Sequence, residues 1–166
     1  MKKGLLATTF VVYLLVVAAI TILPTHISRL RSPQSDHVNL IPFEYSFKCI
    51  LQAHRRHPDL MTFCLRNTLG NIALFLPLGI LLPLIFGRFR ALKRVMAIAF
   101  CLSLSIETIQ FFSRFIGSPR AVDIDDVLLN TLGACLGFVV YKLVRKPGQT
   151  IAVNGNPQAG DELSQK

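Results

Sequence analysis

Long apolar runs with few or no charges alternate with short charged segments along this chain of 166 residues. Four of these runs are long enough for helices that cross a bilayer, near 5–25, 67–87, 95–113 and 124–144. The first run is longer than the apolar core of a signal peptide, which spans about 7–15 residues, so we expect it to remain as a transmembrane helix. The pattern predicts an all-α polytopic membrane protein with four transmembrane helices.

The polar connection 26–66, between the first two predicted spans, contains an amphipathic segment. Apolar side chains recur there at i, i+4, i+7 and i+8 and give a helix one apolar face: Phe43, Phe47, Ile50 and Leu51. This helix could lie flat in the extracytoplasmic membrane interface or pack on top of the bundle, and the pattern leaves both placements open. Cys49 and Cys64 lie in the same connection and could form a disulfide if it faces an oxidising compartment.

Composition and charge agree with a membrane protein. The chain is 52% hydrophobic and 16% charged, whereas a soluble domain carries about 25% charged residues. Its net charge of +9 comes mostly from Lys and Arg at the ends of apolar runs, which fits a lipid bilayer as partner rather than nucleic acid. The dense basic segment 88–94 joins the second and third spans. The positive-inside rule therefore predicts that this segment and both termini are cytoplasmic.

The chain divides into two parts. Residues 1–146 are expected to form one four-helix transmembrane domain, in which Gly133 and Gly137 form a GxxxG pair that allows close helix packing. Residues 147–166 are polar, contain three Gly and two Pro, and show no apolar periodicity. We therefore expect a disordered cytoplasmic tail.

Polar and ionisable side chains interrupt the apolar pattern toward the outer end of the last three predicted spans. The set comprises Asn67, Asn71, Glu107, Gln110, Arg120, Asp123, Asp125, Asp126 and Asn130. An ionisable residue inside a span costs about 2.5–3.5 kcal/mol on insertion scales, so such residues usually mark a functional site. We predict that the set forms a ligand-binding pocket, with Glu107, Asp123 and Asp126 as the candidates for catalysis.

Each of these residues also has a structural interpretation. Glu107 could form a buried contact with Arg120 or Arg114, and the asparagines could form interhelical hydrogen bonds instead of orienting a ligand. The three aspartates could bind a divalent cation through oxygen ligands, and we expect no other cofactor. Alternatively, Asp123 caps the last helix and the acids in its first turn suit the helix dipole, which leaves Asp125 unexplained.

The short connection between the third and fourth predicted spans makes these two helices antiparallel neighbours. Glu107 approaches this connection from one helix, and Asp123 enters the next helix directly after it. We therefore predict that Glu107, Arg120 and Asp123 form one connected cluster at the outer end of the bundle.

Four short segments, in this order along the chain, resemble the VanZ-like family, which is named for a protein linked to resistance to the glycopeptide teicoplanin. The segments are Asn39-Leu-Ile-Pro-Phe43, Asn67-x-x-Gly-Asn71 with Phe75-x-Pro77-x-Gly79, Glu107-x-x-Gln110, and Arg120-x-x-Asp123-x-Asp125-Asp126 with Asn130-Thr-x-Gly133. The resemblance implies a small polytopic protein of the bacterial cell membrane. It brings no assigned reaction.

Two functional hypotheses follow from these observations. In the first, the protein binds an envelope component, such as a lipid-linked precursor, at an outer polar pocket, with a link to teicoplanin resistance. In the second, it is an intramembrane enzyme that acts on a lipid-linked or phosphorylated substrate, with Glu107 as acid or base and a metal on the aspartates. Metal dependence combined with a pH optimum would distinguish the enzyme from the binder.

Overall fold

The computed structural model describes residues 2–22, 38–56, 58–113, 115 and 122–145. Its helices are α1 (Lys2–Ile22), α3 (Glu44–Arg56), α4 (Pro58–Ile85), α5 (Leu92–Ser113) and α6 (Ile124–Val144). A 3-10 turn, η1 (Gly87–Phe89), joins α4 to α5, and the two short strands are β1 (Val38–Asn39) and β2 (Val122–Asp123). Arg120 and the tail 147–166 lie outside the described residues.

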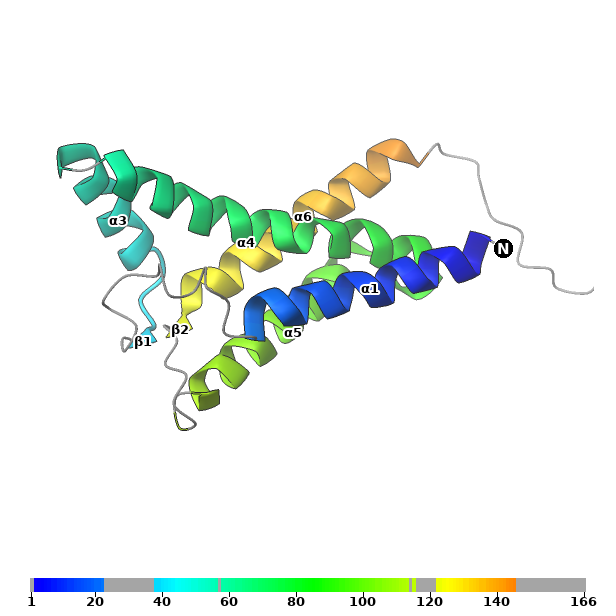
Figure 1. Ribbon diagram of the computed structural model, residues 1–166. Helices are drawn as coiled ribbons and strands as arrows, with labels where there is room; N and C mark the ends of the chain where they lie inside the picture. Colours follow the sequence, from blue (N-terminus) through cyan, green and yellow to red (C-terminus); the bar gives the residue numbers. More distant parts are fainter. Residues whose placement is uncertain (1, 23–37, 57, 114, 116–121, 146–166) are drawn as a thin grey trace, which may run out of the picture.

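Four helices are long and apolar enough to cross a membrane, which confirms the predicted all-α fold with four spans. The apolar segments are Gly4–Ile22, Cys64–Ile85, Leu92–Ser113 and Ile124–Val144. The second span is part of a longer helix, which begins at Pro58 and whose apolar part, Cys64–Ile85, begins slightly before the predicted span. Figure 1 shows the start of α1 and the end of α6 at one end of the bundle, with α3 and both strands at the other.

Helices α4 and α6 are in direct backbone contact at three glycines. A Cβ atom added to Gly137 would lie 2.0 Å from the carbonyl oxygen of Leu76, and one added to Gly133 would lie 2.2 Å from that of Ile72. From the other side, a Cβ on Gly79 would lie 2.0 Å from the carbonyl oxygen of Ala134. The predicted GxxxG pair therefore serves packing, and Gly79 on α4 completes the contact.

The apolar core lies between the helices and is formed chiefly by α4, α5 and α6. Phe75 and Leu78 of α4 and Val95 and Ala99 of α5 are fully buried, while many apolar side chains on the outer faces are exposed. Helix α1 lies along the bundle, where the hydroxyl of Tyr13 donates a hydrogen bond of 2.8 Å to the carbonyl of Leu74. Apolar side chains exposed along a span are what contact with lipid requires.

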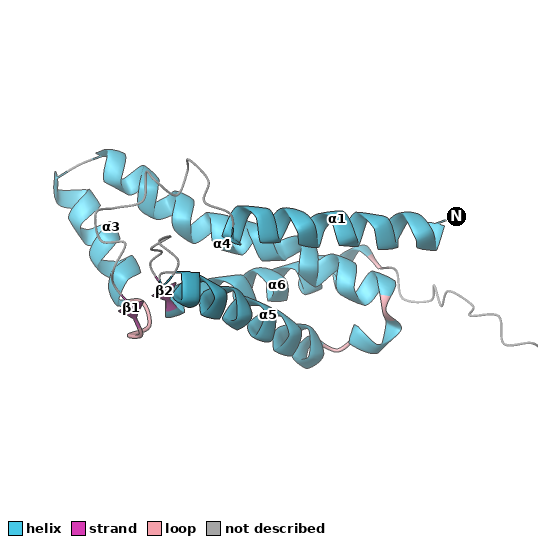
Figure 2. Ribbon diagram, turned by 60° about the horizontal axis from the view of Figure 1, so that its bottom comes forward, coloured by secondary structure: helices cyan, strands magenta, loops and turns pink. Residues whose placement is uncertain are grey.

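A parallel two-residue ladder joins segments that are far apart in the sequence. Strand β1 pairs with β2, with Val38 opposite Val122 and Asn39 opposite Asp123 (Figure 2). The sequence pattern did not predict this ladder, because two-residue strands leave no periodic signal. The ladder brings the segment before α3 to the start of α6.

The amphipathic segment in the first connection forms α3, as its periodicity predicts. Cys49 of α3 and Cys64 of α4 are joined by a disulfide, with their Cα atoms 6.0 Å apart, and both are buried. The side of α3 that carries Cys49 therefore packs on α4, while the apolar face predicted from the sequence remains exposed, including Phe47 and Ile50. Packing on the bundle and an exposed apolar face are thus combined in one helix.

Candidate functional site at the α3 end of the bundle

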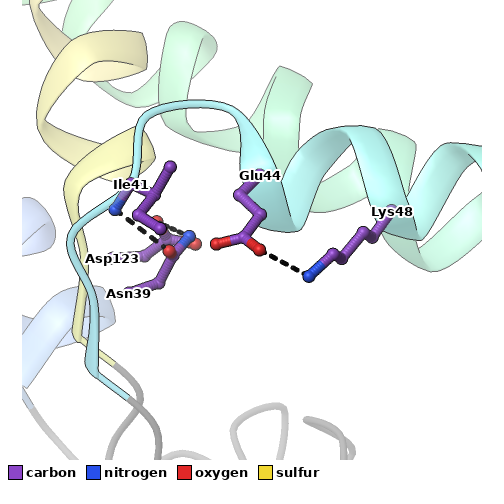
Figure 3. A network of polar contacts seen from close by, with 5 residues as sticks. All are labelled: Asn39, Ile41, Glu44, Lys48 and Asp123. Atoms are coloured by element: carbon purple, nitrogen blue, oxygen red, sulfur yellow. Dashed lines mark hydrogen bonds and ion pairs between the residues drawn. The ribbon is translucent and has the colours of Figure 1, made fainter.

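Asp123 is the N-cap of α6. Its carboxylate accepts a hydrogen bond of 3.0 Å from the backbone N–H of Asp125, as expected of an N-cap aspartate. The same oxygen accepts a hydrogen bond of 3.1 Å from the side-chain amide of Asn39, whose own oxygen accepts from the N–H of Ile41 (Figure 3). Asp123 therefore fixes both the start of α6 and the segment that leads into α3.

Glu107 lies next to this cap, as predicted. Its carboxylate accepts a hydrogen bond of 3.2 Å from the backbone N–H of Asp123, and both side chains are buried. A carboxylate inside the third span and one directly before the fourth span thus belong to one cluster. The third predicted member, Arg120, lies outside the described residues, so its place in the cluster stays a prediction.

Asp125 anchors α3. Its two carboxylate oxygens accept hydrogen bonds from the backbone N–H of Phe43 at 2.5 Å and from the hydroxyl of Ser46 at 2.6 Å. The side chain is only 1% exposed. Phe43 has a φ of 63°, a left-handed conformation that a bulky side chain rarely adopts, and the bond to Asp125 holds it there. This contact accounts for the one aspartate that helix capping left unexplained.

The remaining predicted residues link neighbouring helices. The side-chain amide of Asn71 on α4 donates to Asp126 on α6, and that of Asn130 on α6 donates to the hydroxyl of Ser103 on α5 at 2.8 Å. The amide of Gln110 donates to the carbonyl of Thr21 on α1 at 2.9 Å. Asn67 is half-buried one helical turn before Asn71 and borders the junction of α3 and α4.

Two buried amide oxygens lack a hydrogen-bond partner within the described part of the chain. These atoms are Oε1 of Gln110 and Oδ1 of Asn130. Thr21 offers a carbonyl oxygen, which only accepts, so the nitrogen of Gln110 must face it and the oxygen must point elsewhere. Ser103 can donate or accept, so this argument applies to Gln110 alone. A buried acceptor in this state is a natural place for a donor group from a ligand or water.

Sequence reasoning missed the contribution of α3 and of the residues before it. Asn39 and Ser46 both bind the aspartates, yet neither lies in an apolar span where a polar side chain would be conspicuous. Two signals were available: Asp125, which had no role in capping and therefore needed a partner, and the segment from Asn39 to Phe43, which is one of the four that resemble the family. Among the described residues, no group of three or more His, Cys, Asp or Glu side chains is arranged to hold a metal ion.

Comparison with known proteins identifies the family. The family model described as VanZ/LLP1 matches residues 10–145. This chain belongs to the VanZ/LLP1 family. It is 33% identical over 111 residues to Protein VanZ of Enterococcus faecium, an alignment that covers 64% of this chain and 66% of that protein. The chain thus spans just under two thirds of that relative, and no solved structure matches it.

The family match includes the whole candidate site, because every predicted site residue from Asn67 to Asn130 lies within residues 10–145. Together with the four apolar helices, membership of the VanZ/LLP1 family identifies a multi-pass membrane protein. The polar cluster is therefore part of the shared VanZ/LLP1 region rather than an addition at either end of the chain.

The cap of α6 in this VanZ/LLP1 protein should make its stability depend on pH. Burial raises the pKa of Asp123 from 3.8 to about 6; the hydrogen bond from Asp125 opposes this, and the charges of Asp126 and Asp125 add to it. The folded state then holds the proton more tightly than the unfolded state, so the free energy of unfolding should fall as pH rises from about 4 to about 6.

Thermal unfolding of the detergent-purified protein across this pH range measures the effect. Asp123→Asn is the matched control, because asparagine also caps helices but does not titrate. We expect its unfolding temperature to vary less with pH between these limits. Identical pH profiles for both proteins would show that Asp123 does not titrate in this window.

Proposed function

We propose that this VanZ/LLP1 protein binds a lipid-linked component of the bacterial envelope at the polar end of its bundle. The observation that carries the proposal is the buried Oε1 of Gln110, whose amide nitrogen is held by the carbonyl of Thr21. Glu107 lies one turn before Gln110 on the same face of α5 and is also buried. Hydroxyl or amide groups of a precursor could donate to these oxygens while its lipid chain stays in the bilayer.

The orientation of the protein belongs to the same proposal. Both termini are cytoplasmic in it, so α3 and the polar cluster lie at the outer surface. The disulfide between Cys49 and Cys64 supports this, because disulfides persist in oxidising compartments and are rare in the cytosol. The basic residues of the segment 88–94 lie at the opposite end, as the positive-inside rule requires of the cytoplasmic side.

A fusion reporter tests this orientation directly. Alkaline phosphatase, which is active only after export, should be inactive when fused after Lys146 and active when inserted in the connection before α3. The two fusions control for each other, since they differ only in the side of the membrane that they report. Phosphatase activity from the fusion after Lys146 would show that the orientation is the opposite of the one proposed.

The family link to teicoplanin supplies a cellular assay for the binding proposal. Expression of the protein in a susceptible Gram-positive host should raise the minimum inhibitory concentration of teicoplanin. Glu107→Gln should abolish this increase and weaken binding of a purified polyprenyl-linked peptidoglycan precursor at least about tenfold, or about 1.4 kcal/mol. The glutamine oxygen can still accept the N–H of Asp123, so the fold should persist while the charge is lost.

Thr108→Val is the matched control for this substitution. Thr108 follows Glu107 on α5 but is exposed, and its hydroxyl donates a hydrogen bond to the carbonyl of Leu104 in its own helix. The control should bind the precursor as the wild-type protein does, and its expression should raise the minimum inhibitory concentration of teicoplanin by the same amount. A Glu107→Gln protein that folds normally and binds the precursor as wild type does would contradict the proposal.

One observation supports the enzyme as a second candidate. The pKa of Asp123, raised to about 6 by burial, is near the value that suits a general acid or base close to neutral pH, and Glu107 contacts its backbone. Turnover of the precursor, with a pH optimum and loss of rate on addition of a chelator, would favour this enzyme. Binding without turnover would favour the first proposal.

A further inference from the structure

Helix α3 and the segment before it expose a set of large apolar side chains, which we call the α3 apolar surface. It consists of Leu40 (70% exposed), Ile41 (61%), Phe43 (55%), Phe47 (67%), Ile50 (42%) and Leu51 (42%). These residues lie outside the four membrane-spanning segments, so the lipid that covers the spans does not by itself account for their exposure.

The attachment of α3 sets its level relative to the membrane. The disulfide joins Cys49 to Cys64, and Cys64 is the first residue of the apolar part of α4. The second attachment joins Ser46 to Asp125, which is the second residue of the α6 span. Two independent contacts thus hold α3 at the point where two spans begin, which is the boundary between hydrocarbon and water.

The sides of α3 have three different characters. Ser46 and Cys49 face the protein, through the contacts to α6 and α4. Glu44 and Lys48, one turn apart, form an exposed ion pair on another side (Figure 3). The α3 apolar surface lies between these two sides, at the positions of Phe47 and its neighbours. A helix with a protein side, a charged side and an apolar side suits a position on the edge of a bundle at a membrane surface.

We propose that the α3 apolar surface inserts into the interface of the lipid bilayer and anchors α3 beside the polar cluster. Phospholipid is the occupant that the geometry favours, because the surface lies at the level where the spans enter the membrane and an exposed ion pair lies beside it. A second copy of the chain or a protein partner would also cover apolar side chains, but neither accounts for the attachment at span boundaries. This anchoring is independent of what the polar cluster binds.

Tryptophan fluorescence tests the anchoring, because the chain contains no native tryptophan. Phe47→Trp places a single reporter in the α3 apolar surface, and Lys48→Trp places one on the adjacent charged side. The full-length proteins are reconstituted in phosphatidylcholine vesicles with or without bromine near the headgroup end of the acyl chains. Phe47→Trp should show blue-shifted emission, strong quenching by the brominated lipid and protection from aqueous acrylamide.

The matched variant should behave in the opposite way. Lys48→Trp should emit at longer wavelength, be quenched by acrylamide and respond weakly to brominated lipid. Equal quenching of both variants by acrylamide, with no effect of bromine on Phe47→Trp, would overturn the proposal in favour of a water-exposed surface. Blue-shifted Phe47→Trp emission without quenching by bromine would overturn it in favour of a protein partner or a second copy.

Discussion

Replacing Gly137 with alanine should destabilise the helix bundle strongly. The new Cβ atom would lie 2.0 Å from the carbonyl oxygen of Leu76 and 3.1 Å from the Cα of Gly79, and both of these are backbone atoms that cannot rotate away. Helices α4 and α6 would have to separate, which would disturb the packing of Phe75 and Phe138. Overpacking of this kind costs about 1–3 kcal/mol and can cost more where the backbone has to move.

Thermal unfolding in detergent measures this loss, and size-exclusion chromatography reports aggregation. Gly70→Ala is the matched control, because a Cβ at Gly70 has nothing within 4 Å and alanine favours the helix. We expect the control to unfold at or above the wild-type temperature. Equal unfolding temperatures for Gly137→Ala and Gly70→Ala would show that α4 and α6 are not in close backbone contact.

Asp125→Ala should release α3 from α6. The substitution removes the acceptor for the N–H of Phe43 and for the hydroxyl of Ser46. Hydrogen bonds to a charged group contribute about 1.5–3 kcal/mol each, and Phe43 also loses the contact that holds its left-handed backbone. The disulfide should still hold α3 to α4, so the expected result is local opening rather than unfolding of the whole bundle.

Hydrogen exchange resolves this local effect. Amides from Phe43 to Cys49 should exchange faster in Asp125→Ala, while those of α5 and α6 change less. Two milder variants provide a graded comparison. Ser46→Ala removes one of the two bonds, and Asp125→Asn keeps an acceptor for the N–H of Phe43. Unchanged exchange in Asp125→Ala would show that the aspartate does not anchor α3.

The spans could be predicted from the sequence because each depends on its own residues. A long, predominantly apolar run specifies a transmembrane helix, and Gly133 and Gly137 indicate a close contact on one of these helices. The tertiary fold decides which helix packs against Gly133 and Gly137. That this helix is α4, with Gly79 in the contact, could not be predicted from the glycine pair. The capping role of Asp123 could also be predicted from local sequence, because aspartate is among the residues strongly preferred at the position directly before a helix.

The contacts of the polar cluster could be predicted only in part. The proximity of Glu107 and Asp123 followed from the short connection between their helices. The partner of Asp125 did not, because it is a backbone N–H at position 43 that no residue type reveals. The approach of this segment to α6 depends on the β1–β2 ladder, and pairing of such short strands is set by tertiary structure. The predicted part of Arg120 in the cluster remains a prediction.

The disulfide between α3 and α4 has a consequence for how the protein must be made. Cys49 and Cys64 are separated by 15 positions in the sequence and belong to two different helices. Thiols in the cytosol stay reduced, so in the orientation that we propose this link forms only after translocation. In that orientation biogenesis has two stages, insertion of the spans and then oxidation at the outer surface. A host without thiol-oxidising enzymes would then produce inserted chains in which α3 lacks its covalent link to α4 and is held only by non-covalent contacts, among them the hydrogen bonds to Asp125.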